Sequence, residues 1–221
     1  MPLVIPELII KGVLDGALLS LDHDIKNTVR KEDTILYQIY GDLAYPKFKY
    51  FEEAAKLFRR SNGQARQIMT KLSFDGDISN MPTIHITNAK DSPNAQGIGR
   101  VEESQLVDRD KRTTQVNWVR FSAETNLVMT SNSLEELQLM YNTIRSLMIA
   151  CSETLLLSGI DNIRFGGADV MLTEDMAPKS TYIKALSINY EYDIIIPSMI
   201  RGMLSASSLS AAGTPIPTTN Q

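Results

Sequence analysis

The stretch NSLEELQLMYNTIRSLMIACSETLLLSG, residues 132–159, decides the fold class expected for this chain. Its apolar residues recur at spacings of three and four, which is the period of an amphipathic helix. Ser133 and Glu136 have the spacing of a capping box and predict where the helix starts, and Gly159 predicts where it stops. The predicted stripe comprises Leu137, Met140, Tyr141, Ile144, Leu147, Met148, Cys151 and Leu155. Such a one-sided helix covers other structure with its apolar face.

Segments with the two-residue alternation of β-strands lie on both sides of this helix. Residues 83–89 and 115–130 precede it, and the longer of the two places Val119, Phe121, Ala123, Leu127 and Met129 on one face. Residues 161–175 and 181–197 follow it, with Leu186, Ile188, Tyr190, Tyr192, Ile194 and Ile196 on one face of the last strand. Within 161–175, Gly166 and Gly167 predict a β-bulge.

Helices are also expected near the N-terminus. Residues 3–21 have helical spacing and Pro6 suits a first turn; the expected stripe is Ile5, Leu8, Ile9, Val13, Ala17 and Leu21. Residues 46–61 predict a helix with Phe48, Phe51, Ala55 and Phe58 on one side, and 62–72 predict a short helix. Residues 33–46, with the aromatic cluster Tyr37, Tyr40 and Tyr45, are expected to be strand or irregular.

This order predicts an α+β fold, in which an antiparallel or mixed β-sheet packs against a long helix, with N-terminal helices in front of it. We expect one domain at 1–197, with a protruding polar loop or hairpin at 90–114. Residues 198–221 are rich in Ser, Ala, Thr and Pro and are expected to form a flexible C-terminal arm.

The amino-acid composition argues against several classes of function. The chain has 221 residues, of which 43% are hydrophobic and 22% charged, and its net charge of −4 argues against a nucleic-acid binder held by phosphate contacts. Cys151 is the one cysteine, so neither a disulfide framework nor a multi-cysteine zinc site is expected. The sequence shows no secretory signal pattern and no apolar run of about 20 residues. We expect a protein made in a reducing cytoplasm, without a membrane partner.

No catalytic constellation emerges from the motifs. Gly97 and Gly99 are followed by a charged segment without a third glycine or an apolar stripe, so we interpret them as a loop tip and not a phosphate-binding turn. His23 and His85 have no converging ligand set, and Cys151 lies on an apolar stripe without an identifiable base. We therefore expect no catalytic residues, no cofactor and no metal.

Four features in chain order across 1–197 resemble the tail-terminator and neck proteins of tailed bacteriophages, which act as head-to-tail connectors or tail-completion proteins. The features are the aromatic-rich helix FKYFEEAAKLF (48–58), the proline-led strand MPTIHIT (81–87) before a loop ending in GIG (97–99), the strand WVRFSAETNLVMT (118–130) before SLEEL (133–137), and the closing strand YIKALSINYEYDIII (182–196). The segment RFGGADV (164–170) and the arm 198–221 depart from the family pattern.

The resemblance implies a structural virion protein without enzymatic activity. It implies assembly into a homo-oligomeric ring, commonly of six copies, at the neck or tail end of the virion. Such a ring terminates the tail tube or sheath and joins it to the head connector. The implied partners are other copies of the chain and the neighbouring neck, connector, tube or sheath proteins. The resemblance also implies a lumen through which DNA can pass, without sequence-specific recognition.

The loop 90–114 and the arm 198–221 are the segments expected to contact neighbouring subunits or partners. The expected interface residues are Asn94, Gln96, Arg100, Glu102, Glu103, Arg109, Lys111, Arg112, Ile200, Arg201 and Leu204. Two alternatives stay open. One is a small-ligand-binding or enzymatic α+β domain with a pocket at Tyr190, Tyr192 and the Gly166-Gly167 pair; the other is an adaptor that binds through the arm alone.

Overall fold

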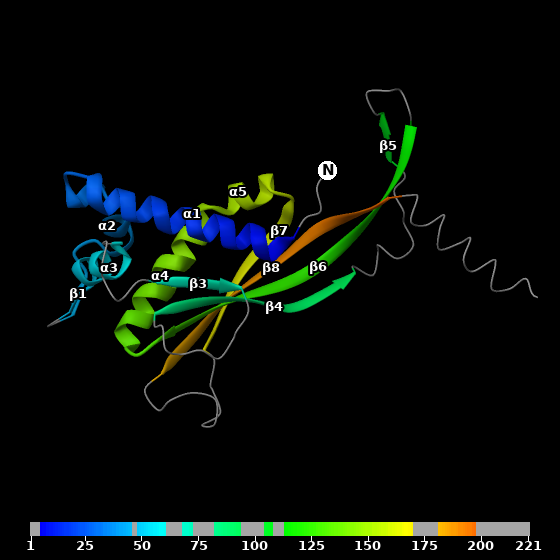
Figure 1. Ribbon diagram of the computed structural model, residues 1–221. Coiled ribbons are helices and arrows are strands. Elements are labelled where there is room, and N and C mark those ends of the chain that lie inside the picture. Colours follow the sequence, from blue (N-terminus) through cyan, green and yellow to red (C-terminus); the bar gives the residue numbers. More distant parts are fainter. Residues whose placement is uncertain are drawn as a thin grey trace, which may run out of the picture. The chain divides into compact units, whose positions relative to one another are not determined.

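The computed structural model of the chain is shown in Figure 1, and it describes residues 5–45, 48–60, 68–72, 82–93, 104–107, 113–169 and 181–197. Helices and a mixed sheet make up these residues, which confirms the predicted α+β class. The chain divides into two compact units. The larger unit contains Val4–Ser92 and Ser122–Tyr192, and the smaller unit contains Met1–Leu3, Pro93–Phe121 and Asp193–Gln221.

Helix α1 (Pro6–Asn27) begins with Pro6 in its first turn, as predicted, and continues six residues past the predicted end. The predicted apolar stripe was partly wrong. The buried face of α1 consists of Pro6, Ile10, Leu14, Ala17, Leu18 and Leu21. Ile5 and Leu8 are 42% and 50% exposed. The helix carries apolar residues on two faces, and packing against the rest of the larger unit selects which face is buried.

Residues 33–46 contain a short helix where strand or irregular structure was expected. After the 3-10 turn η1 (Lys31–Asp33), α2 (Ile35–Tyr40) starts at Thr34, whose hydroxyl accepts a hydrogen bond from the backbone N–H of Tyr37. The helix stops at Gly41, whose φ of 54° is one that glycine adopts without strain. The capping residue therefore outweighed the strand-like composition of the segment.

A two-stranded hairpin follows, made of β1 (Ala44–Tyr45) and β2 (Phe48–Lys49), and leads into α3 (Tyr50–Phe58). The predicted helix at 46–61 is thus confirmed for its central part. Its buried side consists of Ala54 and Phe58, so the predicted stripe was partly wrong. Phe48 lies on β2, and Phe51 and Ala55 are only half-buried. Aromatic rings join α2 to this region, with Tyr40 stacked on Tyr50 at 6.1 Å between ring centroids.

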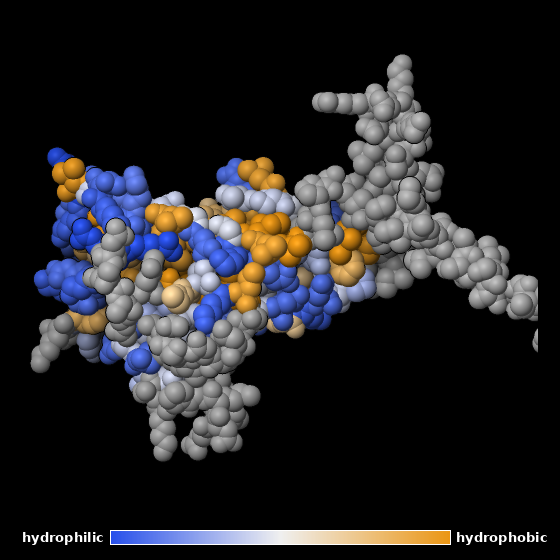
Figure 2. All heavy atoms as spheres, viewed as in Figure 1, coloured by the Kyte–Doolittle hydropathy of each residue, from blue (hydrophilic) through white to orange (hydrophobic). Residues whose placement is uncertain are grey.

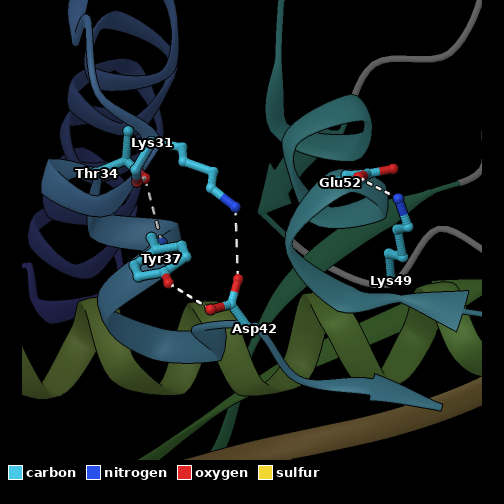
Figure 3. Close-up of polar contacts among 6 residues, drawn as sticks. All are labelled: Lys31, Thr34, Tyr37, Asp42, Lys49 and Glu52. Atoms are coloured by element: carbon cyan, nitrogen blue, oxygen red, sulfur yellow. Dashed lines mark hydrogen bonds and ion pairs between the residues drawn. The ribbon is translucent and has the colours of Figure 1, made fainter.

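Exposed polar contacts surround α2 and α3 (Figure 3). The Tyr37 hydroxyl donates to the Asp42 carboxylate at 2.8 Å, and Lys31 Nζ lies 3.4 Å from the other Asp42 oxygen. The hydrogen bond from Tyr37 lowers the pKa of Asp42. Lys49 and Glu52 form a further pair at 2.9 Å. Solvent screens such ion pairs, so they contribute little to stability.

The large sheet of the described residues runs β3-β4-β6-β8-β7, with β5 paired to β6. β3 pairs parallel with β4, whereas β5–β6 and β7–β8 are antiparallel. The strand bounds are β3 (Met69–Leu72), β4 (Thr83–Pro93), β5 (Ser104–Val107), β6 (Thr113–Ser131), β7 (Ile160–Asp169) and β8 (Tyr182–Pro197).

Residues 69–72 were predicted as helix and are instead the edge strand β3. Each residue from Met69 to Leu72 has a partner in β4, starting with Met69 opposite Thr83. This pairing joins segments that the sequence keeps apart, so a local pattern could not reveal it. β5 lies within the polar segment 90–114 and pairs with the start of β6.

The long predicted helix is present as two consecutive helices, α4 (Leu134–Ala150) and α5 (Ser152–Leu157). The Ser133 half of the predicted capping box is confirmed, because the Ser133 hydroxyl accepts a hydrogen bond from the Glu136 N–H. The Glu136 carboxylate bonds the Ser131 hydroxyl, which in turn accepts from the Ser133 N–H at 3.1 Å. The helix breaks at Cys151 (φ −86°, ψ 7°), and Gly159 follows the last turn with φ 90°.

Helices α1, α4 and α5 contact one another and the strands β3 and β7, so they cover one face of the sheet in the larger unit (Figure 1). The core between them contains Leu127 and Met129 from β6, Leu186 and Ile188 from β8, and the predicted helical stripe from Leu137 to Met148 together with Leu155. Cys151, also predicted in that stripe, is only half-buried. The predicted alternation is confirmed for Ala123, Leu127 and Met129 on β6, and for the alternate residues from Leu186 to Tyr192 on β8. Val119, Phe121 and Ile194 are only half-buried, and the side chain of Ile196 lies outside what the structure describes.

The bulge predicted at Gly166 and Gly167 is wrong. Both glycines keep regular register with β8, and the register shift lies between Asp161 and Arg164, where Asn162 has φ 50°. Gly167 has a packing reason instead: a Cβ there would lie 1.9 Å from the hydroxyl oxygen of Tyr141 on α4. The glycine lets helix and sheet approach closely.

Candidate functional site

All eleven predicted interface residues lie outside the part of the chain that the structure describes. They are Asn94, Gln96, Arg100, Glu102, Glu103, Arg109, Lys111, Arg112, Ile200, Arg201 and Leu204. The two grooves of the larger unit are formed by other, described residues. Of the residues that line these grooves, only Tyr190 was proposed as a site residue from the sequence.

The most apolar candidate is a groove at the start of α1, which we call the α1 groove. It has a volume of about 450 Å³ and opens to solvent. Its lining consists of Ile5, Glu7, Leu8, Leu72, Ile86, Thr87 and Asn88. In the larger unit, apolar side chains gather on the surface over the start of α1 (Figure 2). The groove is thus a place where exposed apolar surface is concentrated rather than scattered.

Two side-chain contacts fix α1 above the strands that form the groove. Asn88 Nδ2 donates to Glu7 Oε1 at 2.9 Å near the start of the helix. Further along α1, the Thr70 hydroxyl of β3 donates to the Asp15 carboxylate at 2.5 Å. These contacts tie the helix to β4 and β3, so the groove is preformed.

The strand β3 borders the α1 groove. Among the described strands β3 lies at the end of the sheet, and its residues Met69 and Leu72 are 44% and 40% exposed. The end of a sheet is the position at which a strand of another chain can be added. Sequence reasoning missed the groove because it placed β3 in a helix. The available signal was the apolar pair Ile5 and Leu8, at the N-cap and in the first turn of α1, neither of which belongs to the buried face of the helix.

A second, polar groove lies against β4, β6, β7 and β8 and has a volume of about 230 Å³. Its lining residues are Lys90, Ser92, Ser122, Ala123, Glu124, Asn162, Arg164, Asn189, Tyr190 and Glu191. Asn162 Nδ2 donates to Glu191 Oε2 at 2.7 Å, which anchors the bulged residue of β7. Charges of both signs line this groove, and it suits a small polar ligand better than an apolar one.

The tyrosines of the alternative pocket hypothesis are largely core residues. Tyr190 is 2% exposed, and its hydroxyl lies 2.9 Å from that of Thr125. Tyr192 is 5% exposed and donates to Asp91 at 3.0 Å. Tyr190 also touches the polar groove, whereas Tyr192, Gly166 and Gly167 are absent from its lining. The structure brings the two rings within 6.1 Å of each other.

Burial controls the acidity of both hydroxyls. It raises the pKa of Tyr190 to about 12. Burial, together with the hydrogen bond to the Asp91 carboxylate, also raises the pKa of Tyr192. Both tyrosines therefore stay protonated at neutral pH, which suits a structural role and does not suit a general base.

The smaller unit offers one well-formed polar contact among its described side chains. Arg120 on β6 binds Asp193 on β8 through Nε at 2.9 Å and through a terminal nitrogen at 3.1 Å. This bidentate geometry is the strongest that an arginine–carboxylate pair adopts. Because the Arg120 side chain is 45% exposed, water still weakens the pair.

The histidines and the cysteine, which were considered as catalytic or metal-binding residues, do not lie together. His85 is 3% exposed within β4, His23 is exposed on α1, and burial raises the pKa of the Cys151 thiol. Within the described ranges, no three His, Cys, Asp or Glu side chains converge as metal ligands. In the same part of the chain, no helix has the length and apolar character to cross a membrane.

No protein-family model matches the chain, and no curated protein matches it either.

Proposed function

We propose that this chain is a structural protein of a tailed-phage virion. It forms a homo-oligomeric ring at the neck or tail end, terminates the tail tube or sheath, and joins it to the head connector. On this proposal the protein is made in the host cytoplasm and resides in the virion. Its role is assembly and not catalysis.

The observation that carries the proposal is the position of β3 at the end of the sheet of described strands, beside the apolar α1 groove. An exposed strand edge and a concentrated apolar surface are the two features by which one subunit binds the next. The resemblance in the order of helices, strands and polar loop supports the same assignment. A ring of identical subunits needs such a surface, since each copy must bind a different patch of its neighbour.

Negative-stain electron microscopy of the purified chain over a concentration series tests the proposal. Closed rings with a central channel are expected, either alone or when tail tubes are added as a template. Met69→Lys places a charge on the edge strand and should prevent ring closure, because the edge then repels a neighbour. Val29→Lys, at a position 99% exposed outside the sheet, is the matched control.

The same experiment can also contradict the proposal. Monomers at every concentration, with no binding to added tail tubes, contradict it. Equal ring formation by Met69→Lys and Val29→Lys would remove β3 from the interface and leave the ring itself standing.

One observation favours a second candidate, a small-ligand-binding domain. The polar groove has carboxylates and cations around a volume of about 230 Å³, which is small for a ligand site. A zwitterionic ligand bound only by the native state would raise the melting temperature. A thermal-shift screen with amino acids and short peptides, repeated with Arg164→Gln, tests this candidate, and no shift by any compound contradicts it.

A further inference from the structure

The α1 groove has an unusually simple chemical character. Of the described residues that line it, Ile5, Leu8, Leu72 and Ile86 are apolar, Thr87 and Asn88 are neutral, and Glu7 is charged. A fitting occupant therefore has several adjacent apolar side chains and one cation. Its volume of about 450 Å³ admits a few such side chains and lies in the usual range of binding pockets.

The C-terminal arm 198–221 has the complementary character in its sequence. Met199, Ile200, Met203 and Leu204 are its clustered apolar residues, and Arg201 is its single charged residue. Positions 199, 200, 203 and 204 have the spacing that places side chains on one face of a helix. An amphipathic segment of this kind binds an apolar groove through a few anchors at that spacing.

We propose that the arm of one copy docks in the α1 groove of a neighbouring copy. Ile200 and Leu204 contact the apolar lining near Leu8, and Arg201 pairs with Glu7. The inference rests on the proposed ring, because an arm that binds a different surface on the next copy is a heterologous contact, the kind that closes into rings.

The length of the chain constrains this contact. Leu204 lies seven residues beyond Pro197, where β8 ends, so an extended arm carries it about 25 Å at most from the sheet. A neighbour's groove must therefore lie close to the end of β8. The arm can therefore dock only on a directly adjacent copy and cannot reach a more distant one.

Cysteine cross-linking in the full-length chain tests the docking. Cys151 is first replaced by Ala, which leaves a chain without cysteine. One preparation then carries Leu8→Cys and a second, with a larger tag, carries Leu204→Cys. Mild oxidation of the mixture should link the two chains, since a disulfide forms only where Cα atoms come within about 7 Å. Leu19→Cys is the matched control, on the same helix and 53% exposed against 50% for Leu8.

The expected result is a mixed disulfide that forms at least tenfold faster with Leu8→Cys than with Leu19→Cys. Glu7→Lys in the Leu8→Cys chain should lower the rate about tenfold, because it turns the attraction to Arg201 into repulsion. Arg201→Glu in the partner chain should then restore it. This restoration separates a direct pair from a general loss of folding.

Two results overturn the inference. One is equal rates for Leu8→Cys and Leu19→Cys. The other is a link within a single chain, and none between chains, when both cysteines are placed in one copy, since the arm then binds its own groove. Rings in electron micrographs without the selective link would leave the proposed function intact. The selective link in a chain that forms rings neither alone nor on added tail tubes would retain arm docking as a contact between two copies and contradict the ring.

Discussion

Replacing Gly167 with alanine gives the sharpest test of how helix α4 packs on the sheet. The added Cβ would lie 1.9 Å from the Tyr141 hydroxyl oxygen and 3.0 Å from the ring carbon that bears it. Tyr141 is 8% exposed, and the Lys184 ammonium lies 4.5 Å from its ring centroid. The ring therefore has little room to retreat, and either it or the strand must shift.

Over-packing of this kind costs about 1–3 kcal/mol of unfolding free energy. In a chain of this size that corresponds to a fall in melting temperature of about 2–4 °C per kcal/mol. Urea unfolding followed by far-ultraviolet circular dichroism measures the loss. Gly12→Ala is the matched control, because no atom lies within 4 Å of its added Cβ on exposed α1. It should stabilise the chain by up to about 1 kcal/mol through helix propensity.

A double-mutant cycle identifies the clash as the cause. Tyr141→Phe removes the oxygen that the new Cβ would meet, so Gly167→Ala should cost less in that background than in the wild type. An unchanged cost, or a Gly167→Ala variant as stable as the wild type, would refute the close approach of α4 and β7 as described here.

Three further predictions concern buried hydroxyls and a helix cap. Tyr40→Phe should cost about 1–2 kcal/mol in urea unfolding, because the Tyr40 hydroxyl bonds a backbone carbonyl of α4 at 2.9 Å and the Thr143 hydroxyl at 2.8 Å, both buried. Ser133→Ala should cost about 1 kcal/mol through loss of the cap on Glu136, and Ser133→Asp should recover most of it; equal stability of all three chains would contradict the cap. The raised pKa of Tyr190 means that the unfolded chain releases this proton from about pH 10 and the folded chain only near pH 12, so stability should fall as pH rises through that window. Tyr190→Phe should make the fall shallower in pH-dependent unfolding, and an unchanged slope would contradict the assignment.

The candidate sites show where prediction from sequence stopped. Leu8 was recognised as an apolar helical residue but assigned to the buried stripe, although it is 50% exposed. Leu72 was assigned to a helix, although it lies on edge strand β3. Both errors have the same cause. When a helix has apolar residues on two faces, its neighbours decide which face is buried. When a strand has only four residues, its pairing partner decides that it is a strand, because its own pattern is too short to do so.

Local chemistry by itself determined the elements whose signals lie within a few residues. The Ser133 cap, the apolar stripe of α4, and the alternation of β6 and β8 all follow from short-range spacing, and they suffice for the α+β class. Tertiary structure alone decided the parallel pairing of β3, the face of α1 that is buried, and the need for glycine at Gly167. Each of these depends on contacts between residues far apart in the chain, and the free energy of those contacts exceeds the small local preferences that a sequence pattern records.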